Sequence, residues 1–305
     1  HSNALELNTV RVAAKSKKKR KKQQYRAGPG DVDVAEQTFN ANSEFTSPHD
    51  GDIGDEDKDV GAVERIAAVE QHGHRGDVRC IALSTDDKLL LSASRKSAKL
   101  WNVVTGECIR SIPTSGYSLS TCFLGANSQF AAVGSKHGSL EIVDLGSGEV
   151  IAASTEAHSD AIWSVTLDGE LYDSTTLVTG GADKFVRFWD LTNVYSQLAK
   201  SRELKLIRTL ELPDEVLCVR VAYQRQQPVI VVSLMDSTVR AFDLVSLDPY
   251  MTFYGHKMPV LGLDISSDGL MLATGSADKS IKLWGMDFGD CRRSLRAHAD
   301  SVLCV

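Results

Sequence analysis

The chain lacks several features that would assign it to a particular class of protein. No apolar stretch of about 18 residues or more occurs in its 305 residues, which excludes a membrane-spanning helix. Its six cysteines lie at least 13 residues apart, so no Cys-x-x-Cys pair is available for zinc binding or redox chemistry. We therefore predict that the cysteines are small buried residues in a reducing compartment.

A secretory signal is also missing from the first residues. The chain begins with His1 instead of methionine, so we expect it to start partway through a longer protein. Hydrophobic residues make up 42% of the chain, which is enough to build a core and excludes a wholly disordered protein.

The net charge of -6 hides an uneven distribution. Residues 11–26 carry nine Lys or Arg and no acid, whereas residues 31–64 carry eleven acids and one Lys. Segments of like charge with few apolar residues repel themselves and do not pack. We predict that residues 11–64 form a disordered linker, basic and then acidic. The dense basic run consists of Lys15, Lys17, Lys18, Lys19, Arg20, Lys21 and Lys22.

Three interpretations of this basic run remain open. It is a nuclear localisation signal, a nucleic-acid-binding arm, or a solvated tether without a partner. The acidic cluster at residues 50–59 could compete with RNA for the basic run by pairing with it. Deleting residues 50–59 tests this hypothesis, since RNA affinity across a salt titration should then rise.

From residue 72 onward the sequence repeats itself. Five segments end alike: SAKLWN at 97–102, SLEIVD at 139–144, FVRFWD at 185–190, TVRAFD at 238–243 and SIKLWG at 280–285. Their equivalent positions, Trp101, Val143, Trp189, Phe242 and Trp284, are 42, 46, 53 and 42 residues apart. A period of this length is typical of propellers and solenoids.

The pattern within each repeat indicates β-structure. In the last full repeat, the short apolar runs 260–265 and 270–273 are separated by SSDG, a tight turn, and residues 281–284 alternate. The longest spacing is explained by residues 194–204, which we predict to be an inserted loop with a helical turn. Four short strands per repeat predict an all-β fold, a propeller of which about four to five blades are present.

The repeats resemble those of the WD-repeat family. That resemblance implies a buried polar tetrad of His, Ser or Thr, Asp and Trp in each complete blade. It maps onto two full sets and one partial set: His158, Thr179, Asp183 and Trp189; His256, Thr274, Asp278 and Trp284; and His74, Ser92 and Trp101. In the partial set Lys96 stands where the Asp is expected, and Val143 and Phe242 replace Trp in the second and fourth repeats.

A His–Asp–Thr set also resembles the triad of a hydrolase. A triad occurs once in an enzyme beside an oxyanion hole, whereas these residues recur at the repeat spacing. We therefore predict a structural role and no catalytic residue, cofactor or metal. Trp163 lies on the first strand of its repeat and is predicted to belong to the core.

Both ends of the chain resemble interrupted repeats. Residues 297–305 (AHADSVLCV) match the opening of another blade, and residues 1–10 match the last strand of a preceding blade or propeller. We expect residues 65–305 to be a propeller truncated at its C-terminal end. Unpaired sheet edges would then make the isolated chain poorly soluble or dimeric.

Some sequence motifs go beyond the generic repeat, among them YGHKMPV at 254–260 and GMDFGDC at 285–291. They are similar to the large tandem-propeller WD-repeat subunits of the UTP-B subcomplex of the small-subunit processome. The resemblance implies a non-enzymatic nucleolar scaffold in ribosome biogenesis. Its implied partners are other WD-repeat and helical subunits, pre-ribosomal RNA and small nucleolar RNA, without a membrane.

Within this picture the basic run at 15–22 is the first candidate for RNA contact. Further candidates on the propeller rim are Lys257, Arg292, Arg293 and Arg296. The alternative function is that of another WD-repeat adaptor, such as the substrate receptor of a ubiquitin ligase.

Overall fold

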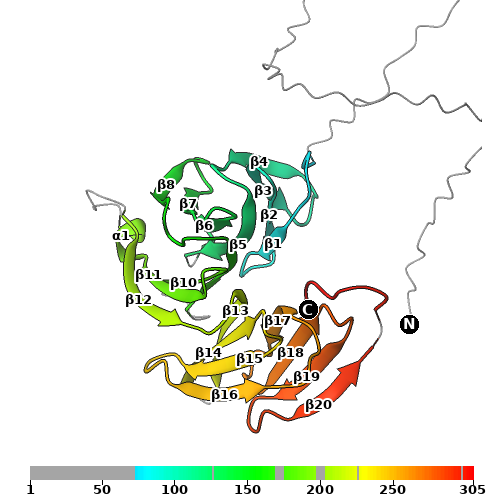
Figure 1. Cartoon of the computed structure of the whole chain (residues 1–305). Coiled ribbons are helices and arrows are strands. Elements are labelled where there is room, and N and C mark those ends of the chain that lie inside the picture. Colours follow the sequence, from blue (N-terminus) through cyan, green and yellow to red (C-terminus); the bar gives the residue numbers. More distant parts are fainter. Residues whose placement is uncertain (1–72, 126, 169–174, 197–202, 225–226, 297) are drawn as a thin grey trace, which may run out of the picture. The chain divides into compact units, whose positions relative to one another are not determined.

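The computed structural model describes residues 73–305, except 126, 169–174, 197–202, 225–226 and 297. It contains five four-stranded antiparallel sheets, which confirms the expected all-β propeller fold (Figure 1). The predictions for residues 1–10 and 11–64 lie outside the described residues.

Each sheet is one blade, and its strands follow one another in chain order. Blade 1 comprises β1 (Cys80–Leu83), β2 (Leu89–Ala93), β3 (Ser97–Asn102) and β4 (Cys108–Pro113). Blade 2 comprises β5 (Ser118–Leu124), β6 (Phe130–Ser135), β7 (Leu140–Asp144) and β8 (Val150–Ser154). Blade 3 comprises β9 (Ile162–Leu167), β10 (Thr176–Gly181), β11 (Phe185–Asp190) and β12 (Lys205–Glu211). Blade 4 comprises β13 (Val216–Gln224), β14 (Gln227–Leu234), β15 (Val239–Asp243) and β16 (Pro249–Phe253). Blade 5 comprises β17 (Val260–Ile265), β18 (Met271–Ser276), β19 (Ile281–Gly285) and β20 (Cys291–Leu295).

The turn between the second and third strands has the same backbone in four blades. Its fourth residue is left-handed, with φ of 77° at Gly138, 71° at Lys184, 71° at Ser237 and 69° at Lys279. Only at Gly138 does close approach also demand glycine, because an added Cβ would collide with the carbonyl oxygen of His158.

The hydrophobic core lies between blades. Each of the four core clusters combines residues of two consecutive blades, and the innermost strands β1, β5, β9, β13 and β17 contact one another in that order. Close packing depends on small residues in the second strand. An added Cβ at Gly180 would lie 2.5 Å from the Cγ1 of Val216 in the next blade. Val302 packs against Gly275 in the same manner.

Two predictions about individual residues are wrong. Trp163 is 42% exposed, because it occupies a bulge in β9 between Ile162 and Ser164 and so faces neither neighbouring blade. Among the cysteines Cys218 is buried, but Cys291 and Cys304 are exposed.

The helical turn in blade 3 is present but begins earlier than expected. It is α1 (Thr192–Tyr195), and residues 197–202 of the predicted loop lie outside the described part of the chain.

Two of the half-buried cysteines have a shifted thiol pKa. Burial raises the pKa of Cys80 and Cys122 to about 12. A thiolate is therefore strongly disfavoured at both positions.

Candidate functional site

Blade 3 contains a continuous chain of four polar side chains. His158 Nδ1 lies 2.8 Å from Asp183 Oδ1, and His158 Nε2 lies 2.7 Å from Thr179 Oγ1. The indole Nε1 of Trp189 donates to the same Thr179 hydroxyl at 2.9 Å. The structure thus brings together all four residues that the sequence assigned to this tetrad.

The direction of donation in blade 3 follows from the charge of His158. Burial holds its pKa below the ordinary value, although Asp183 opposes this shift. Burial alone would raise the pKa of Asp183, but hydrogen bonds from His158 and Arg187 outweigh it and lower that pKa. A neutral imidazole that donates from Nδ1 to the carboxylate can accept the Thr179 hydroxyl proton at Nε2. Every member of the chain is then satisfied.

Blade 5 repeats this arrangement. His256 lies 2.9 Å from Asp278 Oδ2 through Nδ1 and 2.8 Å from Thr274 Oγ1 through Nε2. Trp284 Nε1 donates to Thr274 Oγ1 at 2.8 Å. Burial lowers the pKa of His256 here as well.

Blade 1 keeps three of the four members. Both His74 Nε2 and Trp101 Nε1 lie 2.7 Å from Ser92 Oγ. The prediction that Lys96 occupies the Asp position is wrong, because Ala93 pairs with Ala98 and the turn between them is one residue shorter than in the other blades. The carbonyl of Lys96 accepts a hydrogen bond from Thr114 N. In blade 3 the equivalent bond runs from Leu212 N to the carbonyl of Lys184, the residue after Asp183. Lys96 therefore corresponds to the residue that follows the Asp.

Blades 2 and 4 have apolar residues where the other blades have the hydrogen-bonded Thr or Ser and Trp side chains. In blade 4, Leu212, Val232 and Phe242 occupy the His, Thr and Trp positions and belong to one core cluster. In blade 2, Val133 and Val143 are buried in another. Blade 2 also buries Glu141, whose carboxylate accepts from Ser115 N at 3.2 Å. Glu141 was not among the predicted site residues, although it stands out because the equivalent residues are all basic: Lys99, Arg187, Arg240 and Lys282.

The buried chains have little capacity for chemistry. Thr179 and Thr274 are fully buried, and each hydroxyl is held by both an imidazole and an indole. A nucleophile must reach its substrate, so this geometry does not resemble a working triad. Across residues 73–305, gaps excepted, no group of three or more His, Cys, Asp or Glu could hold a metal ion.

The recurring His–Thr–Asp–Trp sets and the five four-stranded sheets agree with what comparison with known proteins finds. The family described as "WDR3 second beta-propeller domain" matches residues 77–305. The chain belongs to this family. It is 44% identical over 203 residues to U3 small nucleolar RNA-associated protein 12 of Saccharomyces cerevisiae, covering 64% of this chain and 21% of that protein.

Two further relatives agree with this assignment. WD repeat-containing protein 3 of Mus musculus is 44% identical over 198 residues, which is 64% of this chain and 20% of the relative. The WD repeat-containing protein 3 homolog of Dictyostelium discoideum is 40% identical over 215 residues, 70% of this chain and 22% of the relative. The chain thus spans about a fifth of the length of the curated relatives it matches.

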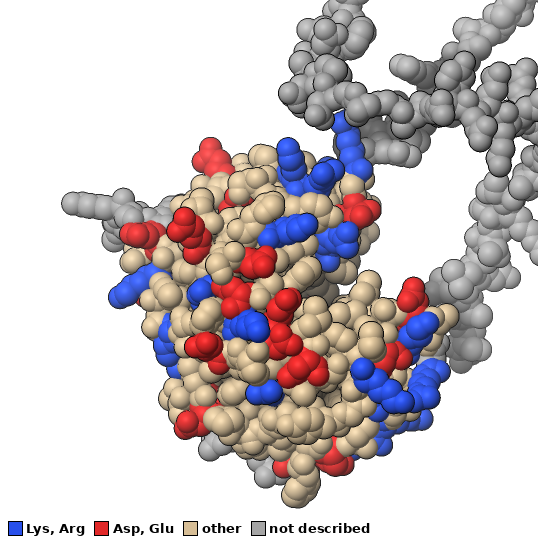
Figure 2. Space-filling view, in the orientation of Figure 1, with Lys and Arg blue, Asp and Glu red and all other residues tan. Residues whose placement is uncertain are grey.

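The surface of this WDR3-type propeller mixes charges of both signs. On the face shown in Figure 2, Lys and Arg gather over blade 1 and beside β20, whereas acidic side chains are interspersed between them. Lys257, Arg292, Arg293 and Arg296 are all exposed. Arg292 is engaged with Asp287 at 2.8 Å. The basic run at 15–22 lies outside the described residues.

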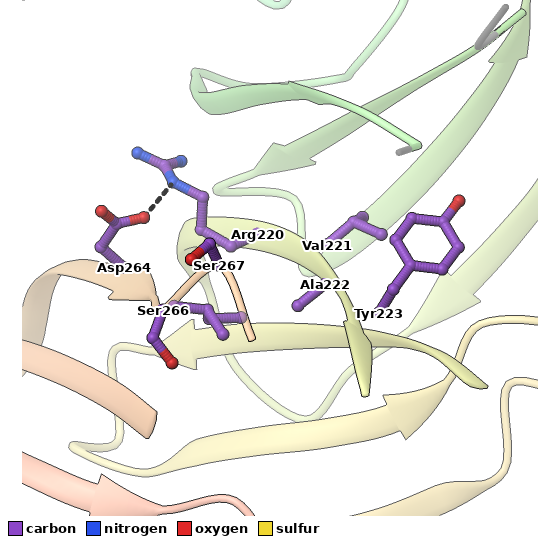
Figure 3. A pocket seen from close by; sticks show the side chains of 8 residues that line it. Arg220, Val221, Ala222, Tyr223, Asp264, Ser266 and Ser267 are labelled. Atoms are coloured by element: carbon purple, nitrogen blue, oxygen red, sulfur yellow. Dashed lines mark ion pairs between the residues drawn. The ribbon is translucent and has the colours of Figure 1, made fainter. Parts of the chain in front are cut away.

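One depression occurs between the innermost strands of blades 4 and 5 (Figure 3). It holds about 190 Å³, less than the roughly 300 Å³ or more of ordinary small-molecule sites. Arg220 and Asp264 form an ion pair at 3.9 Å at its edge, and both are partly exposed. Among the described residues no helix is long and apolar enough to cross a membrane.

Proposed function

We propose that this protein is a non-enzymatic scaffold in small-subunit ribosome biogenesis in the nucleolus. It would contribute to assembly of the UTP-B subcomplex and the processome, and so to pre-rRNA processing. The observation that carries this proposal is the match of residues 77–305 to the WDR3 second propeller family, together with a relative named for its association with U3 small nucleolar RNA.

The geometry supports a scaffold role over a catalytic one. The only His–Asp–Thr sets among the described residues are the two in blades 3 and 5, and their hydroxyls are sealed in the core. A stack of sheets joined by inter-blade cores holds its exposed turns at fixed positions, so several protein partners can dock at once. Neither a cofactor nor a metal has a part in this mechanism.

The RNA contact in this proposal falls to the basic run at 15–22. Residues 65–305 carry 24 basic and 28 acidic groups, so the propeller as a whole does not attract a polyanion. The seven Lys and Arg from Lys15 to Lys22 would release counterions on binding phosphates. The same run could alternatively direct nuclear import.

Affinity purification of the tagged protein from its own cells tests the scaffold role. Processome proteins and precursor RNA should co-purify, whereas recovery of a cullin complex would favour the alternative of a ubiquitin-ligase receptor. Recovery of neither would reject the proposal.

A salt titration tests the RNA contact separately. We expect the purified chain to bind single-stranded RNA with an affinity that falls steeply as salt increases. Replacing the seven basic residues of 15–22 by Gln should reduce the slope of log K against log salt by up to about 0.7 for each phosphate that is no longer neutralised. The matched control replaces Lys88 and Lys205 by Gln, two exposed cations that are not candidates for RNA contact. An unchanged slope in the first variant would assign the RNA contact elsewhere.

A further inference from the structure

The outermost strand of each blade leaves one edge unpaired. Within the described part of the chain, β4, β8, β12, β16 and β20 each stand last in their sheet, so no further strand pairs with them. Such an edge presents a row of unpaired N–H and C=O groups and can pair with a strand of another chain. Charged side chains and proline protect a free edge against this pairing. The composition of the five strands therefore shows which edges are protected.

Four of the five outermost strands carry such protection. Each of the four contains proline or a basic residue: Arg110 and Pro113 in β4, Lys205 and Arg208 in β12, Pro249 in β16, and Arg292 and Arg293 in β20. The exception is β8, whose sequence VIAAS has neither proline nor a charged side chain. Val150 is 44% exposed, and Ala153 is exposed as well. Blade 2 thus has the edge with the weakest protection against strand addition.

Packing explains only part of this composition. Ala152 belongs to the core cluster that also contains Val194 of α1. In β4 the equivalent residue is Arg110, which donates to the carbonyl of Ser147 in the next blade. Burial in the cluster therefore accounts for the small side chain of Ala152. It does not account for Ala153, which is exposed and could carry a charge without entering the core.

The backbone of Ala153 faces outward. Ala153 pairs with Glu141, and its equivalent in β4 is Ser111, which pairs with Lys99. Two residues after Ser111 lies Pro113, which has no N–H and so occupies a position that does not donate to β3. Bonded and non-bonded positions alternate along an antiparallel pair. The N–H and C=O groups of Ala153 therefore face away from β7, where an added strand would lie.

Acidic residues stand at both ends of β8. Glu149 directly precedes the strand and Glu156 follows it by two residues, and both are exposed. Residues 114–156 carry four acids and one Lys. Figure 2 shows acidic side chains over the part of the surface where Figure 1 places β8. This charge repels a polyanion such as RNA and attracts a strand with basic residues.

The same charges disfavour a second copy of this chain as the occupant. Two β8 strands paired in antiparallel orientation would place Glu149 of one copy near Glu156 of the other at both ends. Like charges opposite each other across paired strands are destabilising. The charge pattern thus favours a different protein, whose segment carries Lys or Arg at both ends.

We propose that the free edge of β8 is a docking site for an extended segment of a partner protein, which adds to blade 2 as a fifth strand. The segment consists of a few β-branched or small residues with Lys or Arg on both sides. Its main chain bonds to the edge, and its basic ends lie beside Glu149 and Glu156. This inference rests on the proposed scaffold role, because it names the class of one partner.

Selection from a display library of random short peptides tests the proposal without assuming a sequence. The library is first depleted on the variant Ala153→Lys, which places a protecting charge on the edge, and is then selected on the purified wild-type chain. Enriched peptides should contain β-branched residues with Lys or Arg on both sides. Ala153→Lys and, separately, Ala153→Pro should weaken their binding about tenfold, since each variant disturbs at least one main-chain hydrogen bond to the peptide.

Two further measurements detect the added strand itself. N-methylation of alternate amides in an enriched peptide should abolish binding for one set of positions and weaken it far less for the other, because one edge of the peptide faces β8. Hydrogen exchange at the amide of Ala153 should slow when the peptide is bound. A peptide that contacts only side chains would produce neither result.

Matched variants in blade 1 separate docking from general surface effects. Ser111→Lys places the same charge at the equivalent position of β4 and should leave affinity unchanged. Glu149→Gln with Glu156→Gln should weaken binding and reduce its salt dependence. Glu107→Gln, at the position equivalent to Glu149, should do neither. The circular dichroism and thermal unfolding of every variant should match the wild type, so that lost binding is not lost folding.

Three results would each overturn the proposal. One is that no peptide remains after depletion, or that the enriched peptides lack basic residues. Another is binding that tolerates N-methylation of both sets of alternate amides. The third is a dimer of the wild-type chain in sedimentation that is lost in Ala153→Lys, which would assign the edge to a second copy. Co-purification of processome proteins with Ala153→Lys would leave the scaffold role standing even if strand addition failed.

Discussion

In blades 3 and 5 hydrogen-bonded polar side chains occupy the His, Thr and Trp positions, whereas in blades 2 and 4 the Thr and Trp positions hold apolar side chains. In blade 3 the His158, Thr179 and Trp189 side chains form a hydrogen-bonded chain, whereas in blade 4 Leu212, Val232 and Phe242 fill the equivalent places. Both kinds of blade have four paired strands with matching register. The polar chain is therefore not required to form a blade, but removing one member of a buried chain leaves its partners without a hydrogen bond.

The largest expected effect concerns the carboxylate of blade 3. Asp183 is 3% exposed and pairs with Arg187, 18% exposed, at 2.7 Å, as well as with His158. We expect Asp183→Ala to lower the free energy of unfolding by about 3 kcal/mol, because it leaves the mostly buried guanidinium of Arg187 without a carboxylate and His158 Nδ1 without its acceptor. Denaturant unfolding of the purified protein measures this.

Blade 4 supplies the matched control for Asp183→Ala. Asp236 and Arg240 form the equivalent pair at 3.3 Å, but both are 31% exposed and the His position is Leu212. Asp236→Ala should cost about 0.5 kcal/mol, as exposed pairs do. Equal losses in the two variants would contradict the distinction between polar and apolar blades.

A second pair of variants exchanges Thr and Val at the equivalent positions 179 and 232. Thr179→Val should cost about 2 kcal/mol, since it strands His158 Nε2 and the Trp189 indole N–H in the core. Val232→Thr should cost about 1 kcal/mol, because it buries a hydroxyl among apolar neighbours. Both losses come from the same unfolding measurement, and a neutral Thr179→Val would show that one apolar member is tolerated in a polar chain.

Mild acid should act on the polar blades with a smaller effect. The pKa of His158 and His256 lies below 6.5 in the folded state because both are buried. As pH falls below about 6.5 the unfolded state takes up protons first, so the free energy of unfolding should decrease toward the folded-state pKa values. Urea unfolding from pH 7.5 downward measures this trend. The variant His158→Gln with His256→Gln should lose most of it.

Among the variants that break a polar chain, the smallest effect is expected in blade 1. There His74 is only partly buried, and its Nδ1 has the Ser97 hydroxyl at 3.4 Å in place of a carboxylate. Ser92→Ala should therefore cost about 1 kcal/mol, less than Thr179→Val. Thermal unfolding compares the two variants directly. A larger loss for Ser92→Ala would mean that the missing Asp does not weaken the chain.

The sequence predicted the repeats well because their signals are local. Strand alternation, turn residues and the His and Trp spacing all lie within about 30 residues of one another in each blade. The shorter turn of blade 1 was missed because Lys96 occupies the expected place in a count along the chain, and only strand pairing shows that a residue is absent.

Features that depend on side-chain direction could not be predicted. Trp163 looks like a core residue in an alternating strand, but the bulge in β9 shifts the alternation by one. Glu141 looks like a solvent-facing residue, since its four equivalents are basic. Its buried carboxylate accepts a hydrogen bond from the backbone N–H of Ser115, which lies 26 residues earlier in the chain.

The cores between blades also have a consequence for how the protein folds. Because each hydrophobic cluster belongs to two blades, no blade can bury its apolar side chains before its neighbour has formed. Stability should thus spread along the chain by nearest-neighbour coupling, with high amide protection in blade 3, which shares a cluster with the blade on each side.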